Sequence, residues 1–289
     1  MIGTATIEAT NLQFPETIYS GYDNVVKEKI LKQCDQPVPY SRNVPVWYIV
    51  CVSENFLGNA RIIPFVSAML LIPLTYLISL QFTKNPRVSI LAAFLMALNP
   101  LFLIFDDSSA YSQIWAVAML GAVYMANKKP ILSLPLFLFA IIAKPMAILF
   151  IPAMLALTWK NKPVFYAIAL LSVLSSLTVL LTDSIIEVRS YIQIPNFESF
   201  QKGLDDIWWN ITKHLTVLFI PVIILSLVHK NRMVQFLIIS SILEVALLPM
   251  FTIYTTFPYR LLPLMAFVSI GVSISVFGLT KKNKTIIHV

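Results

Sequence analysis

The segment Ile62–Phe82 reads IIPFVSAMLLIPLTYLISLQF and decides the fold class. None of its side chains is charged, and most of them are apolar. A helix that crosses the hydrocarbon core of a bilayer needs about 20 mainly apolar residues. This segment is therefore predicted to be a transmembrane helix.

The composition of the whole chain agrees with that prediction. Its 289 residues are 58% hydrophobic and only 12% charged, with a mean hydropathy of +0.79. Soluble domains carry about 25% charged residues, so this composition excludes both a soluble globular enzyme and a disordered chain. The two cysteines, Cys34 and Cys51, are too few for a disulfide framework or a tetrahedral zinc site. The sequence leaves open whether they pair with each other.

Further apolar runs predict an all-α, polytopic transmembrane helix bundle. After the first span these runs are Val88–Phe105, Tyr111–Ala126, Ile131–Leu157, Val164–Thr182, Leu215–Val228, Val234–Met250 and Leu262–Thr280. We expect Ile131–Leu157 to form a short re-entrant helical hairpin that turns near Lys144-Pro145. Proline lacks a backbone donor and disfavours helix in the residue before it. One straight crossing is the alternative, and the hairpin gives about seven full spans in total.

The distribution of charge predicts the orientation of the bundle. Eleven of the 21 basic residues, and no acidic residue, lie in five short segments beside the spans: 84–87, 128–129, 160–162, 230–232 and 281–284. Thirteen of the 14 acidic residues lie in three other segments, and Glu244 lies within a span. The net charge of +7 is therefore interpreted as a topology signal, with the basic segments cytoplasmic and the acidic ones extracytoplasmic.

This pattern divides the chain into three parts. Residues 1–61 form an extracytoplasmic first segment, residues 62–280 form the bundle with an extracytoplasmic loop at 183–214, and residues 281–289 form a basic cytoplasmic tail. The sequence shows no apolar run before residue 62 that could lead the first segment across the membrane. We expect that a first helix is missing from the chain as written; the alternative is that the first span carries the short segment across.

Within the first segment, Pro45–Leu57 is apolar but contains Glu54. This combination favours an interfacial helix that lies along the membrane surface.

Polar residues that are candidates for chemistry gather in the segments predicted to face outward. They are Asp23, Asp106, Asp107, Ser109, Gln113, Lys144, Tyr259 and Arg260. Structural alternatives exist, because Asp23 can be a turn residue, an acid before a helix can be a cap, and Arg260 can be an interface anchor. Lys144 can snorkel to the interface. A lysine in an apolar run costs about 2.5–3.5 kcal/mol on insertion scales, which favours a function for it.

With these residues in place, the chain resembles the GT-C superfamily of polytopic glycosyltransferases, particularly its mannosyltransferase and aminoarabinose-transferase-like branches. Four short motifs follow the order of that family. They are Asp23 with Pro39-Tyr40 and Pro45-Val46-Trp47-Tyr48, then Asn99-Pro100 to Trp115, then Ala143-Lys144-Pro145 with Ile151-Pro152, and finally Tyr259 to Leu264. The order of Tyr259 and Arg260 is the reverse of that in the family, and the family's first helix has no counterpart here.

The resemblance implies transfer of a sugar from a polyprenyl or dolichyl phosphate donor to a glycan, lipid or protein acceptor, on the extracytoplasmic face and with inversion. It implies Asp23 and Asp107 as catalytic residues, with Asp23 as the general base, and Arg260 and Lys144 as ligands of the donor phosphate. The residues implied in sugar or acceptor binding are Asp106, Ser109, Gln113 and Tyr259. No metal, other cofactor or nucleic acid is expected.

The same resemblance implies a multi-pass protein of the plasma membrane in a prokaryote, or of the endoplasmic reticulum in a eukaryote, with a cytoplasmic C-terminus. Two other functions are considered. The chain as written can be a truncated or degenerate, non-catalytic membrane subunit. A small-solute transporter predicts a polar path at mid-membrane and two related halves, whereas the sequence shows no internal repeat and only Glu244 lies deep in a span.

Overall fold

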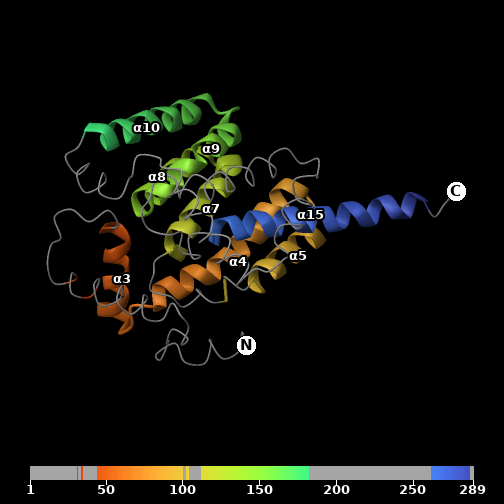
Figure 1. Ribbon diagram of the computed structural model, residues 1–289, viewed down its shortest axis with the longest axis horizontal. Helices are drawn as coiled ribbons and strands as arrows, with labels where there is room; N and C mark the ends of the chain where they lie inside the picture. Colours follow the sequence, from red (N-terminus) through yellow and green to blue (C-terminus); the bar gives the residue numbers. More distant parts are fainter. Residues whose placement is uncertain are drawn as a thin grey trace, which may run out of the picture.

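The computed structural model describes residues 44–99, 102–103, 112–181 and 262–286, together with Leu31 and Cys34. These residues form an all-helical structure, which confirms the predicted all-α class for this part of the chain (Figure 1). The elements in chain order are α3 (Val44–Leu57), α4 (Ile62–Thr83), α5 (Pro86–Ala97), α7 (Ser112–Lys128), α8 (Pro130–Ala143), the 3₁₀ helix η1 (Pro145–Phe150), α9 (Ile151–Thr158), α10 (Lys162–Leu181) and α15 (Leu262–Ile286).

The helix predicted from the opening segment is present as α4. It has 22 residues, which corresponds to about 33 Å at 1.5 Å per residue. Among the described helices, α4 alone is both long and apolar enough to cross a membrane, and shorter apolar stretches lie in α3, α5, α8, α10 and α15. The described part is thus an all-α fold with one helix of full spanning length.

Most of the other predicted elements also correspond to helices. Pro45–Leu57 is α3, Tyr111–Ala126 is α7, Val164–Thr182 is α10, and Leu262–Thr280 begins α15, which continues to Ile286. The predicted spans Leu215–Val228 and Val234–Met250, the loop 183–214 and Glu244 lie outside the described residues.

The predicted span Val88–Phe105 is wrong in its length, because α5 ends at Ala97. Asn99 precedes Pro100, and a residue before proline is disfavoured in the α conformation. Helical backbone is present again at Phe102, whose N–H donates to Oδ1 of Asn99 at 3.4 Å. The apolar run is therefore divided by an Asn-Pro pair that hydropathy alone does not detect.

The predicted break near Lys144-Pro145 is confirmed. The helix α8 ends at Ala143, and Lys144 has an extended backbone with φ −150° and ψ 107°. The N–H of Lys144 donates to the carbonyl of Ala140 at 2.8 Å, which closes α8. η1 begins at Pro145, where the ring disfavours helix in the residue before it. The run therefore forms separate helical pieces.

The packing of α7 against α8 sets the level of Lys144 in the bundle. A Cβ atom built on Gly121 would lie 3.4 Å from Cδ1 of Leu136, so these two residues are level in an antiparallel pair. Counting eight residues away in each direction places Lys144 level with Gln113, in the first turn of α7. Since α9 also packs on α7, the chain turns back after Lys144 instead of extending beyond the start of α7. The re-entrant hairpin itself stays a prediction.

The helices give this part of the molecule two unlike ends. α4 and α7 run in the same direction. Near their ends, the side-chain amide of Gln81 donates to the carbonyl of Tyr124 at 3.3 Å, and near their starts Ile63 and Ile114 line the same groove. α3 lies against the start of α4 and the end of α8 (Figure 1). We call this the α3 end. The opposite, basic end carries the exposed side chains of Lys84, Arg87, Lys128 and Lys129 at the α4–α5 and α7–α8 turns.

α3 is attached to its surroundings by a covalent bond and by hydrogen bonds. Cys34 and Cys51 form a disulfide with a Cα–Cα distance of 5.5 Å, so the pairing that the sequence leaves open does occur. The hydroxyl of Ser53 donates to the carbonyl of Asn59 at 2.6 Å and accepts from the N–H of Ile63 at 3.1 Å. The last turn of α3 is therefore bonded directly to the first turn of α4.

The disulfide gives a first prediction about stability. Replacing both Cys34 and Cys51 by serine is expected to lower the free energy of unfolding by about 3 kcal/mol, because the bond joins residues that are 17 positions apart and a loop of about 15 residues gives that value. The measurement is the thermal unfolding midpoint of the purified protein in detergent, with and without reductant. Reductant should lower the midpoint of the unmodified protein and leave that of the double-serine variant unchanged; equal midpoints under both conditions would contradict the prediction.

Candidate functional site

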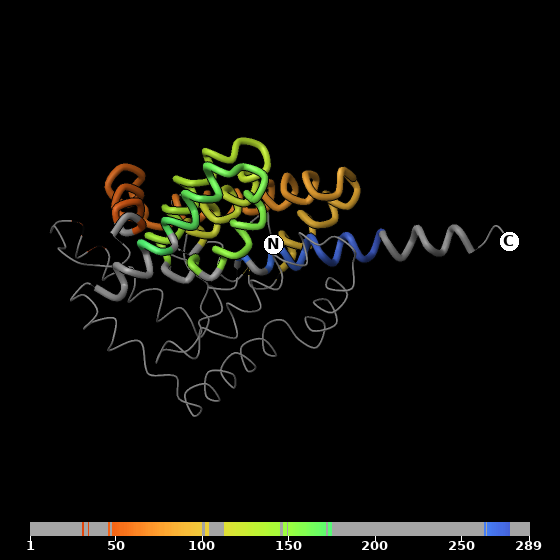
Figure 2. Tube along the Cα trace, turned by 90° about the horizontal axis from the view of Figure 1, so that it is seen from above, coloured from red at the N-terminus to blue at the C-terminus, as the bar shows by residue number. Residues whose placement is uncertain are grey.

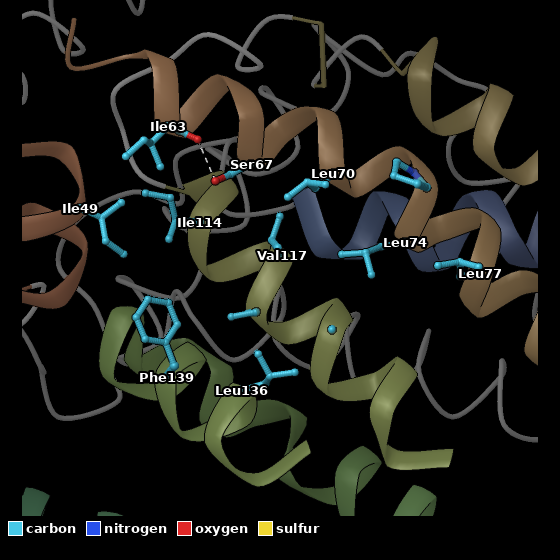
Figure 3. Close-up of a pocket in the computed structure, with 13 residues that line it drawn as sticks. Ile49, Ile63, Ser67, Leu70, Leu74, Leu77, Ile114, Val117, Leu136 and Phe139 are labelled. Carbon is cyan, nitrogen blue, oxygen red and sulfur yellow. Dashed lines mark hydrogen bonds between the residues drawn. The ribbon is translucent and has the colours of Figure 1, made fainter. Parts of the chain in front are cut away.

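An open apolar groove lies between α4, α7 and α8, with Ile49 of α3 at one end (Figure 3). Its volume is about 560 Å³. The lining residues are Ile49, Ile63, Ser67, Leu70, Pro73, Leu74, Leu77, Ile114, Val117, Ala118, Gly121, Leu136 and Phe139. The hydroxyl of Ser67 donates to the carbonyl of Ile63 at 2.8 Å, so the donor of the single polar side chain in this lining is already used. The groove therefore offers an apolar surface to any occupant.

Small side chains on α7 keep this groove open. Ala118 and Gly121 lie on the face of α7 that points toward α4 and α8. Larger side chains at these two positions would occupy the space between the helices. The groove follows the helix axes: Ile49, Ile63 and Ile114 mark its head at the α3 end, and Leu77 lies farther along α4 (Figure 3).

Two buried cationic side chains lie at the α3 end. Arg61 directly precedes α4 and is 3% exposed, and Lys144 directly follows α8 and is 8% exposed. The N–H of Arg61 donates to Oδ1 of Asn59 at 2.9 Å, which fixes the backbone that carries the guanidinium. Both residues have an interaction partner within the chain. Removing a cation from water is costly, so their burial distinguishes this end from the basic end, where the lysines are exposed.

The structure describes two of the predicted site residues, Lys144 and Gln113. The two residues lie at the same height along the bundle, because Gln113 is in the first turn of α7 and Lys144 directly follows the antiparallel α8. Gln113 is fully buried. The other six, Asp23, Asp106, Asp107, Ser109, Tyr259 and Arg260, lie outside the described residues.

Arg61 is a residue that the sequence analysis missed. A signal for it exists, because this arginine stands directly before an apolar span on the side where the acidic segments lie. Positive charge is expected mainly on the other side of a membrane bundle, so a cation in this place calls for an explanation. The groove, in contrast, has no signature in the sequence.

Comparison of the chain with models of protein families, with curated proteins and with solved structures gives no match. The chemistry of the site must therefore be read from its geometry. An apolar groove with buried cations near its head has the features needed to hold an amphiphile with a long apolar tail and an anionic head.

The groove gives a second prediction. Changing Gly121 to leucine should fill the groove and weaken binding of a fluorescent farnesyl-chain probe at least tenfold, because the new side chain occupies the space of the tail. Changing Gly121 to alanine is the matched control, since its Cβ would make an ordinary 3.4 Å contact with the side chain of Leu136. The measurement is a fluorescence titration of the purified protein in detergent. Equal affinities of the two variants would show that the probe binds elsewhere.

Proposed function

We propose that this protein is a polytopic membrane glycosyltransferase that moves a sugar from a polyprenyl or dolichyl phosphate donor to an acceptor on the extracytoplasmic face, by inverting displacement. The observation that carries the proposal is the apolar groove between α4, α7 and α8 with buried Lys144 near its head. The family resemblance of the motifs supports the same activity.

The side-chain distribution supports the membrane part of the proposal. Large apolar side chains point outward, including Ile90 at 61% exposure and Ile131 at 69%. Several buried hydroxyl groups donate to carbonyls of their own helix, as Thr75 does to Leu71 at 2.7 Å. A protein in water carries mostly polar side chains on its surface. A bilayer instead favours apolar side chains outside and hydrogen-bonded polar groups inside.

Two independent features support the orientation. The exposed lysines and arginines at the α4–α5 and α7–α8 turns lie at one end, as expected for the cytoplasmic side. The disulfide between Cys34 and Cys51 attaches to α3 at the other end, and disulfides persist in oxidising compartments. We therefore place the α3 end on the extracytoplasmic side.

The roles of the groove and of Lys144 follow from the chemistry of the donor. A polyprenyl chain is apolar and long, which suits the groove lining. Its phosphate is anionic, and its charge grows as the bond to the anomeric carbon breaks. A cation placed where that charge develops lowers the barrier to reaction. Lys144 and Arg260 supply this charge in the proposal.

Asp23 acts in the proposal as the general base that takes the proton of the acceptor hydroxyl during its attack on the anomeric carbon. Asp107 assists the base. The residues assigned to the sugar and the acceptor are Asp106, Ser109, Gln113 and Tyr259. A single displacement of this kind inverts the anomeric configuration.

The third prediction tests this proposal directly. Changing Lys144 to glutamine should reduce sugar transfer about 100-fold, because one positive charge on the leaving phosphate is lost. The assay measures transfer of labelled hexose from a panel of polyprenyl-phosphate hexoses to endogenous acceptors in membranes containing the full chain. Changing Lys129, which is exposed at the basic end, to glutamine is the control and should leave transfer unchanged.

Changing Asp23 to asparagine should abolish transfer, because the amide cannot accept the proton. Transfer that persists in this variant would remove Asp23 as the base. Absence of transfer from every donor by the unmodified chain would instead favour the non-catalytic subunit.

A further inference from the structure

The turn between α9 and α10 carries aromatic and basic side chains for which the proposed reaction has no role. Trp159 is 59% exposed and Tyr166 is 64% exposed. Lys160 and Lys162 are exposed as well. Phe165 is half-buried and its ring contacts both exposed rings. We call these five residues the α10 cluster.

Contacts between the rings and one lysine hold the α10 cluster together. The ring centroids of Trp159 and Phe165 lie 5.1 Å apart in an edge-to-face arrangement. The Nζ atom of Lys162 lies 4.1 Å from the ring centroid of Trp159 and 5.7 Å from that of Phe165. A cation within about 6 Å of an aromatic face is attracted by the ring. The ammonium group of Lys162 is therefore positioned over the indole ring.

Hydrogen bonds fix the backbone that presents the cluster. The N–H of Asn161 donates to the carbonyl of Thr158 at 2.8 Å, and the N–H of Phe165 donates to the carbonyl of Asn161 at 2.9 Å. Oδ1 of Asn161 accepts from the N–H of Val164 at 3.4 Å, which caps the start of α10. The aromatic and basic side chains are therefore carried by an ordered turn.

The positive charge of the cluster is not neutralised within the described part of the chain. Glu54 is the only acidic residue among the described residues, and it lies on α3. Neither Lys160 nor Lys162 forms an ion pair with any residue that the structure describes. A lysine ammonium group has three hydrogen-bond donors, so the two lysines together suit an anion.

An exposed apolar stripe continues from the cluster along α10. Leu170 follows Tyr166 by four residues and is 59% exposed, and Val173 follows three residues later and is 56% exposed. Residues at these spacings share one face of a helix. α10 packs against α9 and α8 and lies at the upper edge of the described helices (Figure 1). Its outer face therefore offers an apolar surface that leads away from two lysines.

We propose that the α10 cluster binds an anionic phospholipid of the surrounding bilayer, with the lipid head at Lys160 and Lys162 and an acyl chain along the apolar stripe. Exposed tryptophan and tyrosine side chains are typical of the headgroup level of a membrane, and lysines at that level attract anionic lipids. This site is separate from the groove, because no residue of the cluster or the stripe lines the groove.

The experiment compares dansyl-labelled phosphatidylglycerol, which has a net negative charge, with dansyl-labelled phosphatidylcholine, which has none. Dissociation constants are measured by fluorescence titration of the purified full chain in an uncharged detergent. The unmodified protein should bind phosphatidylglycerol about 25-fold more tightly, because each of the two lysines contributes about fivefold toward an anionic lipid. Changing Lys160 and Lys162 together to glutamine should remove this preference and leave the affinity for phosphatidylcholine within twofold.

Changing Lys128 and Lys129 together to glutamine is the matched control. These two lysines are also neighbours at an exposed turn, and Nζ of Lys128 also lies near a ring, 5.1 Å from the centroid of Tyr124. The change in total charge is the same, so this variant should keep the preference for phosphatidylglycerol. An equal loss in both double variants would show that only the total charge of the protein matters, and it would overturn the proposal.

The ring of Trp159 is tested by two single variants. Changing Trp159 to leucine should weaken binding of phosphatidylglycerol about threefold, because Lys162 loses the ring that positions it. Changing Trp159 to phenylalanine keeps a ring and should leave the affinity within twofold. The thermal unfolding midpoint should stay the same in both variants, since the side chain is exposed. An equal loss in both would contradict the positioning of Lys162 by the ring.

Two further results separate this site from the groove and from unspecific lipid contact. Changing Gly121 to leucine, which fills the groove, should leave the preference for phosphatidylglycerol unchanged. Loss of the preference in that variant would place the lipid in the groove and overturn the role of the α10 cluster. Equal affinities of the unmodified protein for the two lipids would overturn it as well. A loss confined to the Lys160 and Lys162 variant supports the proposal.

Discussion

The structure depends on one constraint, which is that each helix must satisfy its own polar groups. Large apolar side chains cover much of the outer surface. A polar group of one helix therefore finds few hydrogen-bond partners on the side chains of the neighbouring helices. Several buried serines and threonines meet the constraint locally, whereas the buried hydroxyl of Ser79 has no hydrogen-bond partner in the part of the chain that the structure describes. The hydroxyl groups of Thr158, Ser269 and Ser273 donate to carbonyls four residues earlier, each at 2.7 Å. Small side chains of this kind allow helices to pack closely, and these three hydroxyl groups stay paired within their own helices.

A second feature is the difference between the two ends of the bundle. At the basic end, lysines and arginines follow or precede tight turns and stay exposed; Lys84, for example, has a φ of 55° and its N–H closes α4 by donating to Leu80 at 2.9 Å. At the α3 end, charges are buried, and α3 is attached by a disulfide and by the hydroxyl of Ser53. The tube view shows α3 at the left and the blue part of α15 extending toward the right (Figure 2). Burial of a charged side chain is costly and is typical of functional sites, so we expect the functional site at the α3 end.

Several elements could be predicted from the sequence because the signal for each is local. α4 follows from an uninterrupted apolar run, and the break after Ala143 follows from Pro145 and its effect on the preceding residue. The extent of α5 was missed, because hydropathy counts side chains and does not register how Pro100 restricts Asn99. The groove could not be foreseen from the small residues Ala118 and Gly121, since their effect depends on which helices face them.

The sequence by itself determined the helical class, the apolar character and the separation of basic from acidic segments, because these depend on composition and on residues close together in the chain. Tertiary structure decided which charges share a site. Arg61 and Lys144 are far apart in sequence, and they lie at one end because the start of α4 and the end of α8 both lie beside α3. It also decided which side chains are buried, since burial depends on packing between helices that the chain brings together only when folded.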